Sequence, residues 1–115
     1  MDNDDYRRGK LTLHKKYNEG HAVLTGDFLL TYAFEVLAAD PYLTPDMKVA
    51  LISTLARRSG SDGMIGGQVM DIANEGKQIS LETLRLLHLN KTAALITAAV
   101  EFGGIIAGAS SSQLA

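Results

Sequence analysis

The chain has 115 residues, among them no cysteine, no tryptophan and only two prolines. Without cysteine it can form neither a disulfide framework nor a thiolate metal site, so thiol redox chemistry is excluded. The chain also has no large excess of positive or negative charge, because its formal net charge is only −2 at neutral pH. Since no basic surface field is expected, we expect no nucleic-acid partner.

Long uninterrupted apolar runs are scarce. The most apolar stretches, residues 28–39 and 92–109, are too short or contain Glu35 and Glu101, whereas a bilayer span needs ~20 apolar residues. The first residues, MDNDDYRR, are acidic where a secretory signal peptide is cationic. These features predict a soluble, cytoplasmic protein that is not exported by this route and has no stable membrane insertion.

Apolar residues make up 46 % of the chain and charged residues 21 %, which is typical of a globular domain with a packed core. Residues 19–39 carry apolar side chains on most of the helical circumference, so this segment is predicted to be a helix that is buried nearly all round. Thr44, Pro45 and Asp46 indicate a helix start, and that helix is expected to end near Arg58.

Two further helices are predicted, one over about residues 61–75 and one from a cap at Ser80 to about Val100. After residues 103–104 the helical pattern weakens, and the small polar tail, residues 110–115, is typical of a linker. Strands have little room in this pattern. The predicted fold class is therefore all-α.

Three features of the sequence could carry chemistry. The first is a run of three carboxylates followed at once by three cations: Asp2, Asp4, Asp5, Arg7, Arg8 and Lys10. Carboxylate oxygens suit magnesium, and adjacent guanidinium groups match phosphate oxygens. The run could therefore hold a magnesium-bound polyphosphate, although a solvated mixed-charge terminus explains the same residues.

The second feature is a glycine-rich helical segment, residues 63–71. Glycine is costly inside a helix, so three glycines in five positions indicate close approach of another backbone or of a ligand. Gln68, Asp71 and Glu75 share one helical face and could orient a ligand. The alternative is a loop between two helices with an ordinary solvated face.

The third feature is Lys91 followed by Thr92 in an otherwise apolar helix. The lysine could extend to the surface along its apolar stem, or it could point into a cavity and meet an anion. His14, His21 and His88 show no zinc-ligand spacing, and we interpret them as structural or surface residues.

Four motifs occur together in a fixed order: DNDDYRRGK at residues 2–10, GD at 26–27, GGQxxD with EGK at 66–77, and KT at 91–92. Over nearly all of the chain, this set resembles the trans-isoprenyl diphosphate synthases. They form the polyprenyl synthetase family, which includes bacterial farnesyl and geranylgeranyl diphosphate synthases. The resemblance implies a helical bundle of the isoprenoid synthase type, present here in part, and a homodimer.

The resemblance also implies an activity, a prenyltransferase reaction. An allylic diphosphate ionises, isopentenyl diphosphate attacks the carbocation, and loss of a proton gives a longer linear isoprenoid diphosphate. The implied cofactor is Mg²⁺. The cations on the leaving diphosphate and a dry apolar cavity would stabilise and protect the charges that develop.

By the same resemblance, the binding residues can be assigned position by position. Asp2 corresponds to the last aspartate of the first aspartate-rich motif, a magnesium ligand. Arg7 resembles the arginine that holds the allylic diphosphate, and Arg8 the one that holds isopentenyl diphosphate. These three assignments place the diphosphates beside the amino-terminal run.

The implied catalytic residues are Lys91, Thr92 and Gln68, which also bind substrate. Lys91 resembles the lysine that contacts the allylic diphosphate, while Thr92 and Gln68 resemble residues that flank the reacting allylic carbons. Asp71 lies on the same face as Gln68 and is assigned to the substrate site as a supporting residue.

Several family features lie outside the 115 residues. These are the first two aspartates of the first motif, the whole second aspartate-rich motif, and the upstream lysine, arginine and histidine of the isopentenyl diphosphate site. One aspartate of the cluster cannot hold three magnesium ions. We therefore expect residues 1–115 to be a single domain, the central part of a polyprenyl synthetase domain truncated at both ends, and inactive alone. The alternatives are a non-catalytic helical subunit that binds diphosphates or a partner, and a helical module without a ligand.

Overall fold

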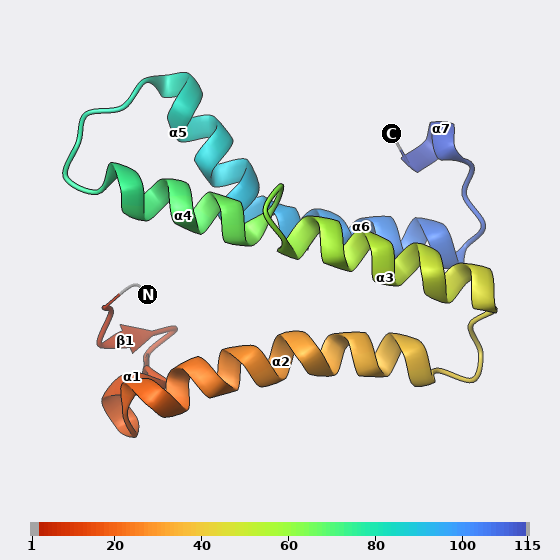
Figure 1. Cartoon of the computed structure of the whole chain (residues 1–115), viewed down its shortest axis with the longest axis horizontal. Helices are drawn as coiled ribbons and strands as arrows, with labels where there is room; N and C mark the ends of the chain where they lie inside the picture. Colours follow the sequence, from red (N-terminus) through yellow and green to blue (C-terminus); the bar gives the residue numbers. More distant parts are fainter. Residues whose placement is uncertain (1–2, 115) are drawn as a thin grey trace. The chain divides into compact units, whose positions relative to one another are not determined.

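The computed structural model describes residues 3–114, apart from the side chain of Ser111, and Figure 1 shows its ribbon. The elements, in chain order, are β1 (Tyr6–Arg7), β2 (Lys10–Leu11), α1 (Leu13–Lys16), α2 (Glu19–Ala39), α3 (Pro45–Ser59), α4 (Met64–Asn74), α5 (Leu81–His88), η1 (Leu89–Ala93), α6 (Ala94–Ile106) and α7 (Ser111–Leu114). The all-α prediction is confirmed. The described residues also contain a β-hairpin with two residues in each strand, which the sequence did not indicate. The chain divides into two compact units, Met1–Val36 and Leu37–Ala115.

The first unit opens with a β-hairpin. Its strands are antiparallel, with Tyr6 opposite Leu11 and Arg7 opposite Lys10. The two turn residues, Arg8 and Gly9, have φ values of 51° and 75°, as in the type I′ turn that matches strand twist. A short turn of this kind was missed because arginine seldom occupies its first position.

The helix α2 follows, and its side chains are more exposed than predicted. The prediction that it is buried nearly all round is wrong, because Val23, Leu24 and Phe28 are 62 %, 67 % and 59 % exposed. Burial needs other segments to cover a helix. Besides α2 up to Val36, the helices and strands of the first unit are only the hairpin and the four-residue α1, which are too short to do so.

Two helices are long and apolar enough to cross a membrane by length and composition: α2 and the continuous helix Leu81–Ile106. Both helices begin well before the apolar stretches 28–39 and 92–109, so each helix is longer than the apolar stretch alone, and they contain the expected Glu35 and Glu101. The core helices of soluble proteins meet the same criterion, so it does not by itself indicate a membrane protein.

The second unit is built on α3 packed along α6, and on α4 packed against α5 and η1 (Figure 1). Its buried apolar core comprises Leu51, Leu55, Leu87, Ala94 and Ala98. The helix α3 begins and ends as predicted: the hydroxyl of Thr44 accepts a hydrogen bond from the N–H of Met47 at 3.3 Å, and Gly60 caps its C-terminus. Ser80 caps α5 in the same way, accepting from the N–H of Thr83 at 3.1 Å.

The helix α4 begins at Met64, about three residues later than predicted. The intervening residues form a turn in which the carbonyl of Gly60 accepts hydrogen bonds from the N–H groups of Gly63 and Gly66, at 3.1 and 3.3 Å. The helical pattern of the sequence extends across this turn, but the early residues use their hydrogen bonds to close the turn instead.

Two more expectations about the second unit need correction. The predicted last helix contains a π-helical turn, η1, and continues to Ile106. The tail expected to be a linker forms the short helix α7, and Leu114 packs on Gly104 of α6. Apolar contact with α6 accounts for this order, and no local signal in a serine-rich tail predicts it.

Candidate functional site

In the second unit, α4 and η1 meet through their backbones at Gly67, which is buried. A Cβ atom built on Gly67 would lie 2.2 Å from the backbone nitrogen of Lys91 and 2.7 Å from the carbonyl carbon of Asn90. No side chain fits in that space. The interpretation of the glycine-rich segment as a place of close backbone approach is thus confirmed, and the neighbouring backbone belongs to the Lys91–Thr92 motif.

The other glycines of the segment fold its beginning tightly. A Cβ on Gly63 would lie 2.0 Å from the carbonyl oxygen of Arg58, and one on Gly66 would lie 1.8 Å from that of Ser61. The contact at Gly63 joins the start of α4 to the end of α3, and the contact at Gly66 closes the turn between the two helices. The glycines therefore fix where α4 begins and how closely it approaches η1.

Lys91 lies at the centre of η1, which interrupts the helix between α5 and α6. Such π-helical turns are rare and occur frequently at functional sites, because the wider turn redirects the side chains it carries. The turn spans Leu89–Ala93 and so contains both Lys91 and Thr92. The residues of this turn, LNKTA, carry no local signal that distinguishes a π-helical turn from an α-helix.

The ammonium group of Lys91 lies 2.5 Å from Oδ2 of Asp71 on α4. The two side chains are 23 % and 38 % exposed, so the ion pair is partly shielded from water. The sequence left two directions open for the Lys91 side chain. The structure favours the one in which its ammonium group meets an anion, here Asp71, over extension to the surface. Gln68, one turn before Asp71, is half-buried, and Thr92 is exposed.

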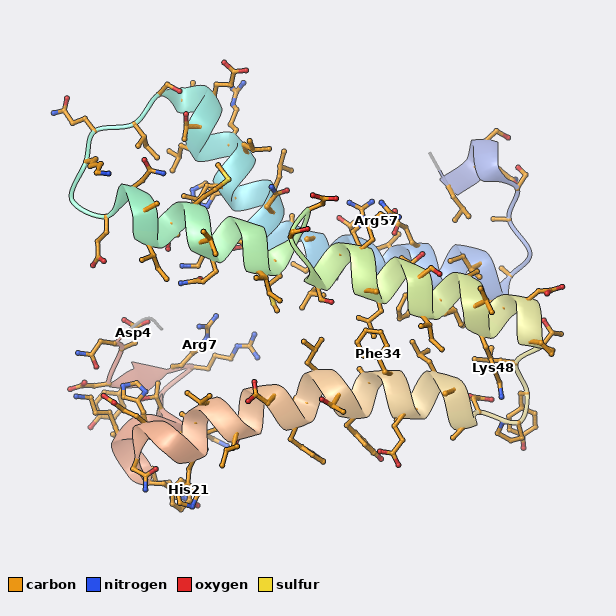
Figure 2. All side chains as sticks on the ribbon, in the orientation of Figure 1. Asp4, Arg7, His21, Phe34, Lys48 and Arg57 are labelled. Atoms are coloured by element: carbon orange, nitrogen blue, oxygen red, sulfur yellow. The ribbon has the colours of Figure 1, made fainter. Side chains whose placement is uncertain are left out.

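The structure thus brings four of the predicted site residues together in the second unit: Gln68, Asp71, Lys91 and Thr92. Glu75, expected on the same face, is instead the C-cap of α4 and is exposed. Arg7 and Arg8 belong to the hairpin of the first unit and are exposed. Figure 2 labels Asp4 and Arg7 there.

The metal ligand expected from the resemblance, Asp2, lies outside the described residues. Within residues 3–114, no group of three or more histidine, aspartate or glutamate side chains is placed to hold a metal ion. Asp5, one of the remaining carboxylates of the run, forms an ion pair with Lys15 at 2.9 Å. The described residues therefore do not fit a magnesium cluster by themselves.

Sequence analysis missed one charged cluster, which links α3 to α6. Arg58 donates hydrogen bonds to both carboxylate oxygens of Glu101, that from its Nε measuring 3.3 Å, and Arg57 lies 3.6 Å from the same carboxylate. Hydrogen bonding by Arg58 lowers the pKa of Glu101, burial opposes this shift, and the positive charges of Arg58 and Arg57 add to it. A glutamate within an apolar helix was the available signal, and it predicts a buried partner.

The whole chain, residues 1–115, matches the family model described as polyprenyl synthetase. The chain belongs to the polyprenyl synthetase family. The predicted resemblance is thereby confirmed, and with it the isoprenoid synthase type of all-α fold.

Curated farnesyl and geranylgeranyl diphosphate synthases are similar to the chain. A farnesyl diphosphate synthase of Micrococcus luteus is 46 % identical over 114 residues, which are 99 % of this chain and 39 % of that protein. A geranylgeranyl diphosphate synthase of Cyanophora paradoxa is 48 % identical over 111 residues, which are 95 % of this chain and 37 % of that protein. The chain therefore spans less than half the length of these relatives.

Solved polyprenyl synthetase structures resemble the fold closely. An FPP/GFPP synthase from Zymomonas mobilis has a TM-score of 0.88 at 42 % identity, with 96 % of this chain and 41 % of that chain covered. A geranyltransferase from Helicobacter pylori also has a TM-score of 0.88, at 43 % identity, with 99 % and 39 % covered. The fold of this chain is thus similar to part of each of those two structures.

Proposed function

We propose that the full-length protein is a prenyltransferase that condenses an allylic diphosphate with isopentenyl diphosphate. The carbon–oxygen bond of the allylic substrate breaks, and the diphosphate leaves with its electron pair. A carbon–carbon bond then forms, and loss of a proton restores a double bond. The observation that carries this proposal is the convergence of Gln68, Asp71 and Lys91 where α4 meets η1, in a chain of the polyprenyl synthetase family.

The chain's own residues contribute charge and position to this reaction. Lys91 binds the allylic diphosphate and stabilises the negative charge that grows on it as the bond breaks. Arg7 binds the same diphosphate and Arg8 that of isopentenyl diphosphate, because guanidinium groups match phosphate oxygens in pairs. Gln68 and Thr92 flank the reacting allylic carbons, and Asp71 supports the site through Lys91.

Magnesium belongs to this proposal as the cofactor of the family. When bound, it neutralises charge on the diphosphate of the allylic substrate. Asp2 is the ligand that this chain would supply. Because the described residues alone do not fit the cluster, the remaining ligands must come from other residues of the full-length protein.

We also propose that the protein acts as a cytoplasmic homodimer. The exposed apolar side chains of α2 support this proposal, since apolar surface of that extent is usually covered by other protein segments. Phe28 and Tyr32 stack on this helix with ring centroids 5.4 Å apart. Sedimentation of the full-length protein tests the assembly, and a monomer at micromolar concentration would contradict it.

Product formation from dimethylallyl diphosphate and isopentenyl diphosphate, with Mg²⁺ or with chelator, tests the reaction. We expect turnover that requires Mg²⁺ and falls by at least about 100-fold in Lys91→Ala and Arg8→Ala. Arg85→Ala, which removes an exposed cation of α5, is the matched control and should retain activity. Diphosphate binding without turnover would instead favour the non-catalytic subunit, and a diphosphate titration that none of these alanine changes affects would favour a helical module without a ligand.

A further inference from the structure

Lys10 has an unusual place in the hairpin, which neither the family motifs nor the site described above explains. In the antiparallel pairing, Lys10 lies directly opposite Arg7. Residues opposite each other project from the same face of a two-stranded ribbon, with Cα atoms about 5.5 Å apart when they flank a tight turn. Two long cationic side chains therefore leave the hairpin side by side.

This arrangement costs stability, because like charges directly opposite one another repel. Within residues 3–114, neither Arg7 nor Lys10 has a hydrogen bond or an ion pair through its side chain. The pairing extends to Asp5, whose carbonyl accepts a hydrogen bond of 3.0 Å from the N–H of Thr12, and Asp5 lies two positions before Arg7, which is the spacing of side chains on one face. Its carboxylate is paired with Lys15, so the two cations lack a dedicated counter-charge in the described part of the chain.

The turn between these two cations is unfavourable as well. Arg8 has a φ of 51°, in the left-handed region that glycine and asparagine occupy more easily. Strained backbone of this kind concentrates at functional sites, where a ligand or partner benefits from it. The four residues from Arg7 to Lys10 thus combine repulsion and strain, and an anion bound to the hairpin would account for both.

We propose that Lys10 is a further substrate-binding residue and that it contacts, together with Arg7, the diphosphate of the allylic substrate. A diphosphate has oxygens on two linked phosphorus atoms, so two adjacent cations can bind it without competing for the same oxygen. This inference rests on the proposed function, which assigns the allylic diphosphate to Arg7. It adds a residue that the family motifs leave unassigned.

Titration calorimetry of the full-length protein with inorganic diphosphate and with dimethylallyl diphosphate tests the inference. We expect Lys10→Ala to weaken both affinities about tenfold and to reduce their salt dependence, because one cation–anion contact is lost. Lys10→Arg should restore most of the affinity. Lys16→Ala is the matched control, since Lys16 is an exposed cation of the same unit whose ammonium lies over the Tyr17 ring.

Hydrogen exchange at the amide of Thr12, which donates to Asp5 in the hairpin, distinguishes a binding role of Lys10 from a structural one. In the protein without ligand, Lys10→Ala should leave the exchange rate unchanged or slower, because the repulsion within the hairpin is relieved. A structural role for Lys10 predicts faster exchange and overturns the inference. If the wild type binds diphosphate and forms product, and Lys10→Ala binds diphosphate equally well, only the inference about Lys10 fails. If the wild type does not bind diphosphate, both the inference and the proposed function fail.

Discussion

Asp71 and Lys91 lie 20 positions apart in the sequence, yet Oδ2 of one is 2.5 Å from Nζ of the other. The pair joins α4 to the π-helical turn η1, and both side chains are partly shielded from water. Directly beside it, Gly67 lets the two backbones meet. The helix α4 therefore contacts Lys91 twice, through its backbone at Gly67 and through its ammonium group at Asp71.

Changing Asp71 to Ala should lower kcat of the full-length protein by about tenfold or more, because a displaced ammonium group stabilises the leaving diphosphate less well. KM should change less, since the other cations still bind the substrate. Steady-state kinetics measure this split. Asp71→Glu should recover part of kcat, and Asp62→Ala, at an exposed position before α4, is the control. Equal losses in Asp71→Ala and Asp62→Ala would contradict a positioning role.

Gly67→Ala should destabilise the protein by about 1–3 kcal/mol, because the new methyl group would overlap the backbone of Lys91 and separate α4 from η1. Urea denaturation measures the change in the free energy of unfolding. Gly103 in α6 offers a matched control, since nothing lies within 4 Å of a Cβ built there. Gly103→Ala should stabilise the protein by about 0.5–1 kcal/mol. A neutral or stabilising effect of Gly67→Ala would refute the close contact.

The ion pair of Arg58 with Glu101 should make stability depend on pH in the acid range. The pKa of Glu101 is lowered in the folded protein, chiefly by its hydrogen bonds to Arg58. Its contribution is therefore complete above the ordinary glutamate value of 4.5 and is lost as the pH falls through the lowered pKa. At neutral pH, Glu101→Gln should reduce the free energy of unfolding by about 1–3 kcal/mol.

Denaturation of Glu101→Gln and wild type between pH 7 and pH 3 measures this dependence. The difference between the two proteins should shrink towards acid pH, because the wild-type carboxyl becomes neutral as well. Glu82→Gln, at an exposed position of α5, should show a much smaller difference at neutral pH. A constant difference for Glu101→Gln across the range would show that the pair is not the source.

Arg8→Gly should strengthen the hairpin and weaken substrate binding at the same time. Glycine adopts a φ of 51° without strain, so the amide of Thr12, which donates to Asp5, should exchange more slowly. The loss of the guanidinium group should raise KM for isopentenyl diphosphate by about tenfold or more. Arg8→Asn, which also tolerates this conformation, should behave alike. Faster exchange in Arg8→Gly would mean that arginine itself holds the turn.

Local chemistry explains why much of the fold could be predicted from the sequence. Thr44 with Pro45, and likewise Ser80, start helices through hydrogen bonds to residues three positions away, and Gly60 ends one. Such signals act within one turn of the chain and need no partner. The motifs likewise identified the family and named Lys91 and Asp71 as site residues.

Contacts between distant segments decided the rest. The sequence placed Gln68 and Asp71 on one face of a helix, but only the packing of α4 on η1 put Asp71 against Lys91. The π-helical turn, the Glu101 pair and the order of the Leu114 tail also depend on neighbours far away in the sequence. The sequence of α2 determined that apolar side chains cover most of the circumference of the helix. Whether that surface is buried depends on other segments, because burial is a property of packing and not of one helix.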